Sequence, residues 1–246
     1  MSLLRAAAHL LFPPACQLCR RPGEFPICQD CLRTLPRIRP PFCPRCGYPL
    51  TSPPGSSGAC PGCPRDRACR FLIRSWGIYD GPLREAVHAL KFGGRRALAR
   101  PLGALMAGVA AADPLLRDVC RIVPVPLHPS RLRERGFNQA QALAEEVGRR
   151  LGTAVDARVL QRVRPTLPQA ELRAVDRRAN VRGAFRMRGR AAWPRVLLVD
   201  DVMSTGSTVA ECARTLRQGG AGEVVVLTLA RALREVSAVR NPAAVV

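Results

Sequence analysis

The segment from Val196 to Thr208 limits the fold of this chain more than any other feature. Val196–Val199 is a continuous apolar run, typical of a buried parallel strand, and Asp200 and Asp201 follow it directly. The bend that comes next is rich in small and hydroxyl side chains: Ser204, Thr205, Gly206, Ser207 and Thr208. A helix that begins after this bend would direct its N-terminus and its free backbone N–H groups at an anion. The segment therefore predicts an open α/β sheet with a phosphate site at the carboxyl edge of this strand.

The acidic doublet predicts a partner for the hydroxyl groups of a sugar. Asp200 and Asp201 can accept hydrogen bonds from the 2′- and 3′-hydroxyls of a ribose. They can also stabilise the positive charge that develops on the ribose ring as its C1–oxygen bond breaks. The alternative is that the doublet and the bend only cap the next helix. No Gly-Lys-Ser/Thr triplet is present, so the segment is not a Walker nucleotide loop.

The same thirteen residues resemble the motif with which type I phosphoribosyltransferases bind 5-phosphoribosyl-1-pyrophosphate (PRPP). Further segments resemble the ComF family of competence-associated phosphoribosyltransferase-like proteins: Tyr79–Leu83, Lys91–Gly94, Val123–His128, Arg131, Arg133, Arg135–Gln139, Gln169–Leu172, Arg177, Asn180 and Gly183–Phe185. The resemblance covers nearly the whole chain. It implies an α/β fold, in which a phosphoribosyltransferase-like parallel sheet flanked by helices follows a small cysteine-rich zinc-ribbon module.

The resemblance also implies a role for particular residues. Asp200, Asp201 and Arg177 are expected to serve catalysis, and residues 204–208 to bind the 5′-phosphate. The expected pyrophosphate site comprises Pro126, Leu127, His128, Arg131, Arg133 and Arg135. The Arg-rich stretch 161–182, with Gln169 and Asn180, matches the mobile catalytic loop of the family. Mg²⁺ would bridge the ribose hydroxyls and the pyrophosphate. Lys91 is either a phosphate contact or an exposed helix end.

Eight of the eleven cysteines form four Cys-x-x-Cys pairs, which indicate metal rather than disulfides in a chain without an export signal. They are Cys16, Cys19, Cys28, Cys31, Cys43, Cys46, Cys60 and Cys63. Two pairs together supply the tetrahedral sulfur cage that Zn²⁺ prefers, and four thiolates leave no open position, so the zinc would be structural. Sequential pairing is the simplest, and interleaved pairing stays open. Iron–sulfur ligation is the alternative, although the spacings are not those of ferredoxins.

The chain is expected to divide near residue 70. Residues 1–70 would form the zinc-ribbon module, with a short helix over Leu3–Phe12, and residues 71–246 the phosphoribosyltransferase-like domain. Apolar runs predict strands over 71–79, 121–126, 196–199 and 223–230, and helical periodicity predicts helices over 82–92, 98–112, 137–151 and 206–218. Residues 155–185 read as irregular. This alternation implies parallel strands with right-handed crossovers.

The charge of the chain leaves two functional hypotheses open. Net charge is +21 and Lys91 is the only lysine, so the excess is arginine, which suits phosphate groups. Composition alone could produce this excess, or the chain could bind PRPP or nucleic acid. One hypothesis is a PRPP-dependent enzyme. The other is a single-stranded DNA-binding competence protein that uses PRPP as a signal or not at all, with competence-machinery proteins as partners. Aromatic residues make up only 4%, which argues against a broad base-stacking surface. No apolar run could span a membrane, and a cytoplasmic location is expected.

Overall fold

The computed structural model describes residues 14–52, 60–63, 71–165 and 179–233. Its helices are α2 (Gln29–Thr34), α3 (Gly81–Phe92), α4 (Ala99–Ala112), α5 (Pro129–Arg135), α6 (Gln139–Leu151) and α8 (Ser207–Gln218), with two 3₁₀ turns, η1 (Arg96–Leu98) and η2 (Pro114–Leu116). Its strands are β1 (Ile73–Ile78), β2 (Arg121–Pro124), β3 (Leu160–Arg162), β4 (Phe185–Met187), β5 (Arg195–Met203) and β6 (Glu223–Arg231). None of the described helices is both long and apolar enough to cross a membrane.

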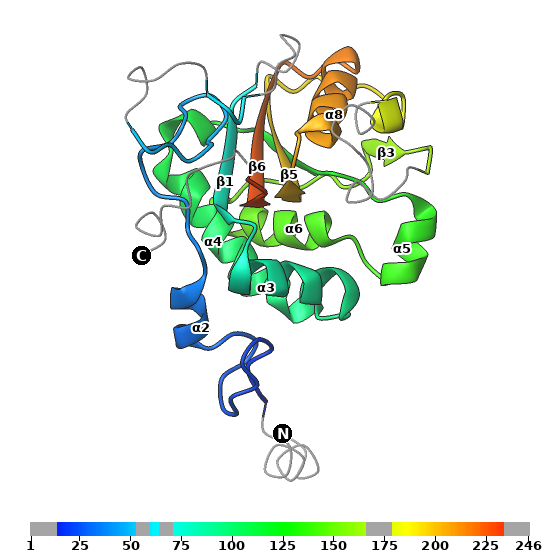
Figure 1. Cartoon of the computed structure of the whole chain (residues 1–246). Helices are drawn as coiled ribbons and strands as arrows, with labels where there is room; N and C mark the ends of the chain where they lie inside the picture. The colour runs from blue at the N-terminus through cyan, green and yellow to red at the C-terminus, as the bar shows by residue number, and fades with distance from the viewer. Residues whose placement is uncertain (1–13, 53–59, 64–70, 166–178, 234–246) are drawn as a thin grey trace.

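Four parallel strands form the central sheet, in the order β1-β6-β5-β2. The two inner strands β5 and β6 are the longest and are buried over most of their length, as their apolar runs predict. Helices cover both faces: α3, α4 and α6 lie on one side and α8 lies on the other (Figure 1). The sheet confirms the expected parallel α/β architecture, and it brings the carboxyl ends of all four strands to one edge.

Strand β5 is longer than expected, because it continues through the acidic doublet to Met203. Asp200 lies opposite Thr228 of β6, and Met203 lies opposite Arg231. The prediction ended the strand at Val199, where the apolar run stops. Backbone pairing with β6 extends it by four residues, and this pairing is non-local. The doublet therefore lies within the last part of the strand and not after it.

Two further features differ from the sequence prediction. Helix α5 was not expected; it begins at Pro129, and the ring of His128 accepts a hydrogen bond from the backbone N–H of Ser130, at 3.3 Å. Strands β3 and β4 form a small antiparallel pair: β3 lies inside the stretch 155–185 that was expected to be irregular, and β4 begins at its last residue. Each has only three residues, which is too short for a recognisable period. The helix expected over Leu3–Phe12 lies outside the described residues.

The cysteine module packs against the sheet edge formed by β1. Residues 36–38 run beside this strand, where the backbone N–H of Ile38 donates to the carbonyl of Trp76 at 3.0 Å, and Ile78 donates to Pro36 at 2.8 Å. The first cysteine group shares a buried cluster with α3 and α4, and the second shares one with α8. The two groups therefore lie on opposite faces of the sheet at this edge.

Candidate active site and metal centres

The two carboxylates of the doublet are directed to opposite faces of the sheet, as side chains at consecutive strand positions are. Asp201 is 8% exposed and forms an ion pair with Lys91 of α3, with 2.9 Å between Nζ and Oδ1. Asp200 lies on the α8 side, within electrostatic range of Arg162 and Cys212. The backbone N–H of Asp201 donates to Oδ1 of Asp200 at 2.9 Å. The two aspartates are thus adjacent in the sequence but interact with different side chains.

The environment of Asp200 favours its protonated form. Burial and the nearby charge of Asp201 raise the pKa of Asp200 to about 7, against the opposing effects of Lys91, the Asp201 N–H and Arg162. Perturbed carboxyl pKa values of this kind are frequent at functional sites. The doublet therefore changes its charge near neutral pH.

We expect Asp200→Asn to stabilise the protein at neutral pH. Between pH 4 and pH 7 the unfolded chain has released the Asp200 proton while the folded chain still holds it, so wild-type stability falls as pH rises through this window. The amide cannot ionise and avoids this loss, which is about 1–3 kcal/mol after allowance for partial exposure. Urea unfolding at pH 4.5 and pH 8 measures it, and equal pH slopes for variant and wild type would contradict the assignment.

Lys91 is not an exposed helix end, which was one of its two expected roles. Its side chain is 19% exposed and contacts Asp201. Burial lowers the pKa of Lys91, but the charges of Asp201 and Asp200 and the hydrogen bond to Asp201 outweigh this and leave the pKa raised. Lys91 therefore remains an ammonium at the carboxyl edge of β5. A phosphate contact stays a prediction.

The bend after β5 ends at the start of α8, as the sequence predicts. Gly206 adopts a left-handed conformation (φ 80°), which glycine tolerates, and as the N-cap residue it gives α8 no side-chain acceptor. The backbone N–H of Ser207 donates to the hydroxyl of Thr205 at 3.4 Å. The hydroxyls of Thr205 and Ser207 lie 2.9 Å apart. The first N–H groups of a helix lack internal acceptors, so this terminus can accept an anion. Ser204, Thr205 and Thr208 are partly exposed, and Gly206 and Ser207 are buried.

The three arginines expected to bind pyrophosphate have different surroundings on α5. Arg131 forms an ion pair with Glu134 at 3.0 Å, and Arg133 is exposed. Arg135 is partly buried, within electrostatic range of Asp201, and its guanidinium lies 4.7 Å from the ring centroid of Phe92. Of the three, Arg135 thus has the clearest relation to the doublet. Pro126 and Leu127 lie in the connection after β2, and His128 caps α5.

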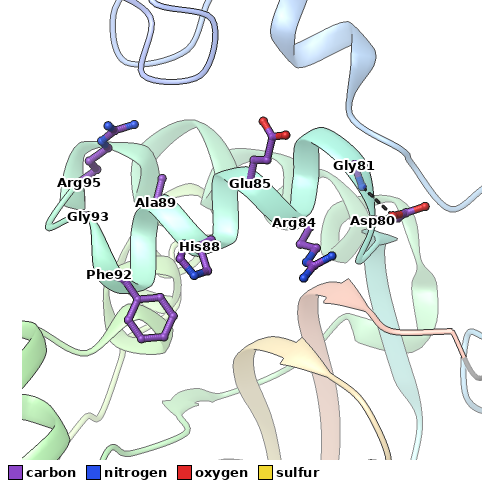
Figure 2. A pocket seen from close by; sticks show the side chains of 9 residues that line it. All are labelled: Asp80, Gly81, Arg84, Glu85, His88, Ala89, Phe92, Gly93 and Arg95. Carbon is purple, nitrogen blue, oxygen red and sulfur yellow. Dashed lines mark hydrogen bonds between the residues drawn. The ribbon is translucent and has the colours of Figure 1, made fainter. Parts of the chain in front are cut away.

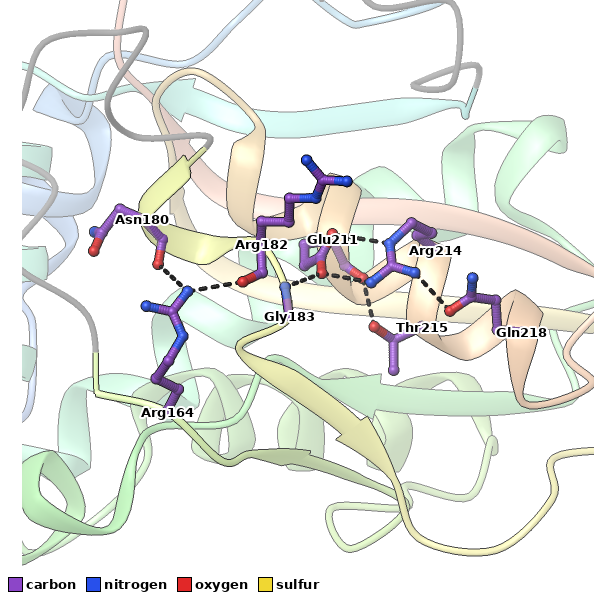
Figure 3. A network of polar contacts seen from close by, with 8 residues as sticks. All are labelled: Arg164, Asn180, Arg182, Gly183, Glu211, Arg214, Thr215 and Gln218. Atoms are coloured by element: carbon purple, nitrogen blue, oxygen red, sulfur yellow. Dashed lines mark hydrogen bonds and ion pairs between the residues drawn. The ribbon is translucent and has the colours of Figure 1, made fainter.

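Polar contacts hold together the two ends of the stretch expected to form the catalytic loop (Figure 3). Arg164 donates to the carbonyls of Asn180 and Arg182, at 3.0 and 2.7 Å. The N–H of Gly183 donates to Glu211 of α8 at 2.6 Å. The two ends of this stretch therefore contact each other, and Gly183, which follows it, is hydrogen-bonded to α8, the helix that begins at the phosphate bend. Gln169 and Arg177 lie outside the described residues.

A shallow hollow of about 690 Å³ lies along the solvent side of α3 (Figure 2). It is lined by Asp80, Gly81, Arg84, Glu85, His88, Ala89, Phe92, Gly93 and Arg95. Neither the doublet nor the phosphate bend lines it. We therefore place the candidate site by the chemistry at the end of β5 and not by this hollow.

The eight paired cysteines form two tetrads in sequential order: Cys16, Cys19, Cys28 and Cys31, then Cys43, Cys46, Cys60 and Cys63. A tetrahedron with Zn–S bonds of about 2.3 Å has S···S edges of about 3.8 Å. The closest sulfur pairs lie at 3.7 Å for Cys19 and Cys28, and at 3.7 and 3.6 Å in the second tetrad. Both tetrads therefore fit zinc, which would be structural because all four positions are filled by thiolates. Cys69 lies outside the described residues, Cys120 is exposed and Cys212 is buried.

Comparison with known proteins matches the cysteine-rich segment to a family model and most of the chain to two relatives. The double zinc ribbon domain family matches residues 7–65. The DNA utilization protein YhgH of Salmonella typhimurium is 37% identical over 230 residues, which cover 91% of this chain and all of that protein. Competence protein F of Haemophilus influenzae is 32% identical over 213 residues, covering 84% of this chain and 90% of that protein.

Solved structures overlap with the chain only weakly. The adenine phosphoribosyltransferase of Leishmania tarentolae is 13% identical, covers 57% of this chain and 73% of its own, and gives a TM-score of 0.33.

A double zinc ribbon joined to an α/β domain with this loop at the end of a central parallel strand defines the class, that of zinc-ribbon proteins with a parallel α/β domain. Within that class the chain belongs to the ComF family, which is shown by its identity with YhgH and competence protein F over most of their length.

Sequence reasoning did not single out several residues at this end of the sheet. Arg162 approaches Asp200, Phe92 lies beneath Arg135, Glu211 holds Gly183, and Arg231 lies opposite Met203. Phe92 and Arg162 lay inside segments that resemble the family, but neither was given a role there. The others are brought in by contacts between distant parts of the chain, and no local pattern marks such contacts.

Proposed function

We propose that the chain binds PRPP with Mg²⁺ at the carboxyl edge of β5 and transfers its phosphoribosyl group to an acceptor. One observation carries this proposal: the acidic doublet and the N-terminus of α8 lie five residues apart at one strand end, with Lys91 and Arg135 beside the doublet. No other arrangement among the described residues combines groups for a sugar with groups for a phosphate in this way.

Different residues would bind the phosphate, the ribose and the pyrophosphate of PRPP. The N–H groups at the start of α8 and the hydroxyls of residues 204–208 would hold the 5′-phosphate. Asp200 and Asp201 would accept hydrogen bonds from the ribose hydroxyls and stabilise the cationic ring as the bond from C1 to the pyrophosphate oxygen breaks. Arg135 and Arg131 would receive the departing pyrophosphate, since guanidinium groups donate paired hydrogen bonds to phosphate. Mg²⁺, when bound, would neutralise the pyrophosphate charge.

Isothermal titration with PRPP tests the proposal. We expect saturable binding with one site per chain when Mg²⁺ is present, and binding at least about tenfold weaker without Mg²⁺, because the pyrophosphate charge is then uncompensated. The titration should also release protons near pH 7, because ionised Asp200 binds the ribose hydroxyls better, and heats measured in two buffers of different ionisation enthalpy reveal this release. The absence of any PRPP-dependent heat in the presence of Mg²⁺ would contradict the proposal.

A second candidate function is binding of single-stranded DNA through its phosphates. Net charge of +21 favours it, and the similar YhgH proteins are named for DNA utilization. Partners from the competence machinery, and the cytoplasmic location, likewise stay predictions.

Gel-shift titration with an oligothymidine strand, repeated over a salt series, tests this second function. If several arginines neutralise phosphates, affinity should fall by about 10²–10³-fold between 50 and 200 mM salt. A matching duplex is the control for strand preference. Binding that is tight but independent of salt would exclude a phosphate-backbone mode.

A further inference from the structure

Arg231 is the last residue of β6 and lies beside the start of the phosphate bend. It is paired with Met203 of β5, and the N–H of Ala232 donates to the carbonyl of Met203 at 2.9 Å. The backbone carbonyl of Arg231 in turn accepts a hydrogen bond from Tyr79 at 2.8 Å. Any displacement of Arg231 would therefore move the residue from which the bend 204–208 departs.

The side chain of Arg231 reaches into the second cysteine tetrad. Its Nη1 donates to the carbonyl of Cys46 at 2.5 Å and its Nη2 donates to the carbonyl of Gly62 at 2.8 Å. Nη2 also lies 3.9 Å from the sulfur of Cys46. Cys46 belongs to the first knuckle of this tetrad, and Gly62 lies in the second knuckle, between Cys60 and Cys63. One guanidinium thus contacts both knuckles.

Arg231 is 1% exposed, and no carboxylate among the described residues pairs with it. A buried charge without a counterion is strongly destabilising. Zinc held by four thiolates has a net charge of about −2. The second tetrad can therefore supply the negative charge that this guanidinium lacks, and only while the metal holds its two knuckles together.

We infer that Arg231 is a positioning residue that couples the zinc of the second tetrad to the phosphate bend. The second zinc is then part of the support of the candidate site, whereas the first zinc is not. The first tetrad lies on the other face of the sheet, and its polar link to the α/β domain runs from Arg95 to the carbonyl of Gln17, at 2.6 Å. The inference about ligand affinity rests on the proposed function, but the coupling itself does not.

The first experiment compares one cysteine-pair variant of each tetrad. The wild type should contain two zinc ions per chain by elemental analysis, and Cys60→Ser/Cys63→Ser and Cys16→Ser/Cys19→Ser should each contain one. Hydrogen exchange of a peptide spanning residues 203–210, with no ligand added, should speed up about tenfold or more in the second-tetrad variant only. Equal exchange in both variants, or wild-type exchange in the second-tetrad variant, would overturn the inference.

The second experiment keeps all eight cysteines and remains decisive if the serine variants do not fold. In Arg231→Met, release of one of the two zinc ions to a chromogenic chelator should be about tenfold faster, because a partner of the ligands is lost, while the other ion leaves at the wild-type rate. Arg231→Lys should restore part of the slow release. Unchanged release of both ions, or equal acceleration of both, would refute the coupling. PRPP affinity of the wild type is measured in parallel. If the wild type does not bind PRPP, the proposed function is wrong, whereas the zinc-release and hydrogen-exchange results still test the coupling.

Discussion

Asp200→Asn/Asp201→Asn should weaken PRPP binding by about 100-fold or more while the fold is retained. Each carboxylate is expected to accept a charge-assisted hydrogen bond from a ribose hydroxyl, and each such bond contributes about 1.5–3 kcal/mol. The amides keep the shape of the side chains but lose the negative charge. Isothermal titration with PRPP and Mg²⁺ measures the loss, and far-ultraviolet circular dichroism measures the fold.

A pair of glutamates elsewhere on the same domain gives a matched control. Glu145→Gln and Glu223→Gln remove two exposed carboxylates, which pair with Arg96 and Arg195, away from the end of β5. This control changes net charge by the same amount as the aspartate variant does. Because both glutamates lie away from the doublet, it should leave PRPP affinity within about twofold of wild type. If the aspartate and glutamate variants lose affinity equally, net charge and not the doublet governs binding.

The central strand and the helix that follows the bend could be predicted because their signals are local. Val196–Val199 is uninterrupted and apolar, and the helical pattern beginning at Gly206 keeps its apolar residues on one face, as α8 shows. The two tetrads could also be predicted, since each knuckle is contained in four residues. In these segments a few neighbouring residues determine the structure.

The partners of the doublet could not be predicted, because they come from distant parts of the chain. Lys91 precedes Asp201 by more than a hundred positions, and its last helical turn gives no sign of a buried ion pair. The division of Asp200 and Asp201 between two faces requires that β5 continue past its apolar run, and only the register with β6 decides this. The residue types of the candidate site could thus be predicted from the sequence, whereas their ion pairs and pKa shifts depend on tertiary contacts.

Helix α5 illustrates a local signal that was present but ambiguous. It begins with Pro129, which favours a first helical turn, and it ends at Gly136, whose left-handed conformation (φ 77°) is typical of a helix end. Histidine is an uncommon cap, and seven residues are few for a period. The helix matters for the site because Arg131 and Arg135, one turn apart, share a side that Arg133 does not.

Lys91→Met should destabilise the protein more than any other single change at the candidate site, and more at high pH than at low pH. The substitution keeps the length and apolar stem of the side chain but leaves Asp201, whose side chain is 11% exposed, without its cation and close to Asp200. Leaving one charge of a buried pair uncompensated costs about 3–5 kcal/mol. Asp200 also loses the charge of Lys91, which in the wild type lowers the pKa of Asp200, so the pKa of Asp200 rises further in the folded variant.

The sign of the pH dependence follows from that raised pKa. The unfolded chain releases the Asp200 proton at the ordinary value for aspartate, whereas the folded variant holds it to higher pH than the wild type does, so the variant loses more stability as pH rises. Urea unfolding at pH 5 and pH 8 should show the larger loss at pH 8. Lys91→Arg should recover most of the stability. Lys91→Met/Asp201→Asn should depend on pH less steeply than Lys91→Met, because the charge of Asp201, which raises the pKa of Asp200, is removed together with the charge of Lys91. A Lys91→Met variant as stable as wild type at pH 8 would mean that the ammonium contributes nothing to the doublet, and Asp201 would then have to be compensated by Arg135 or by water.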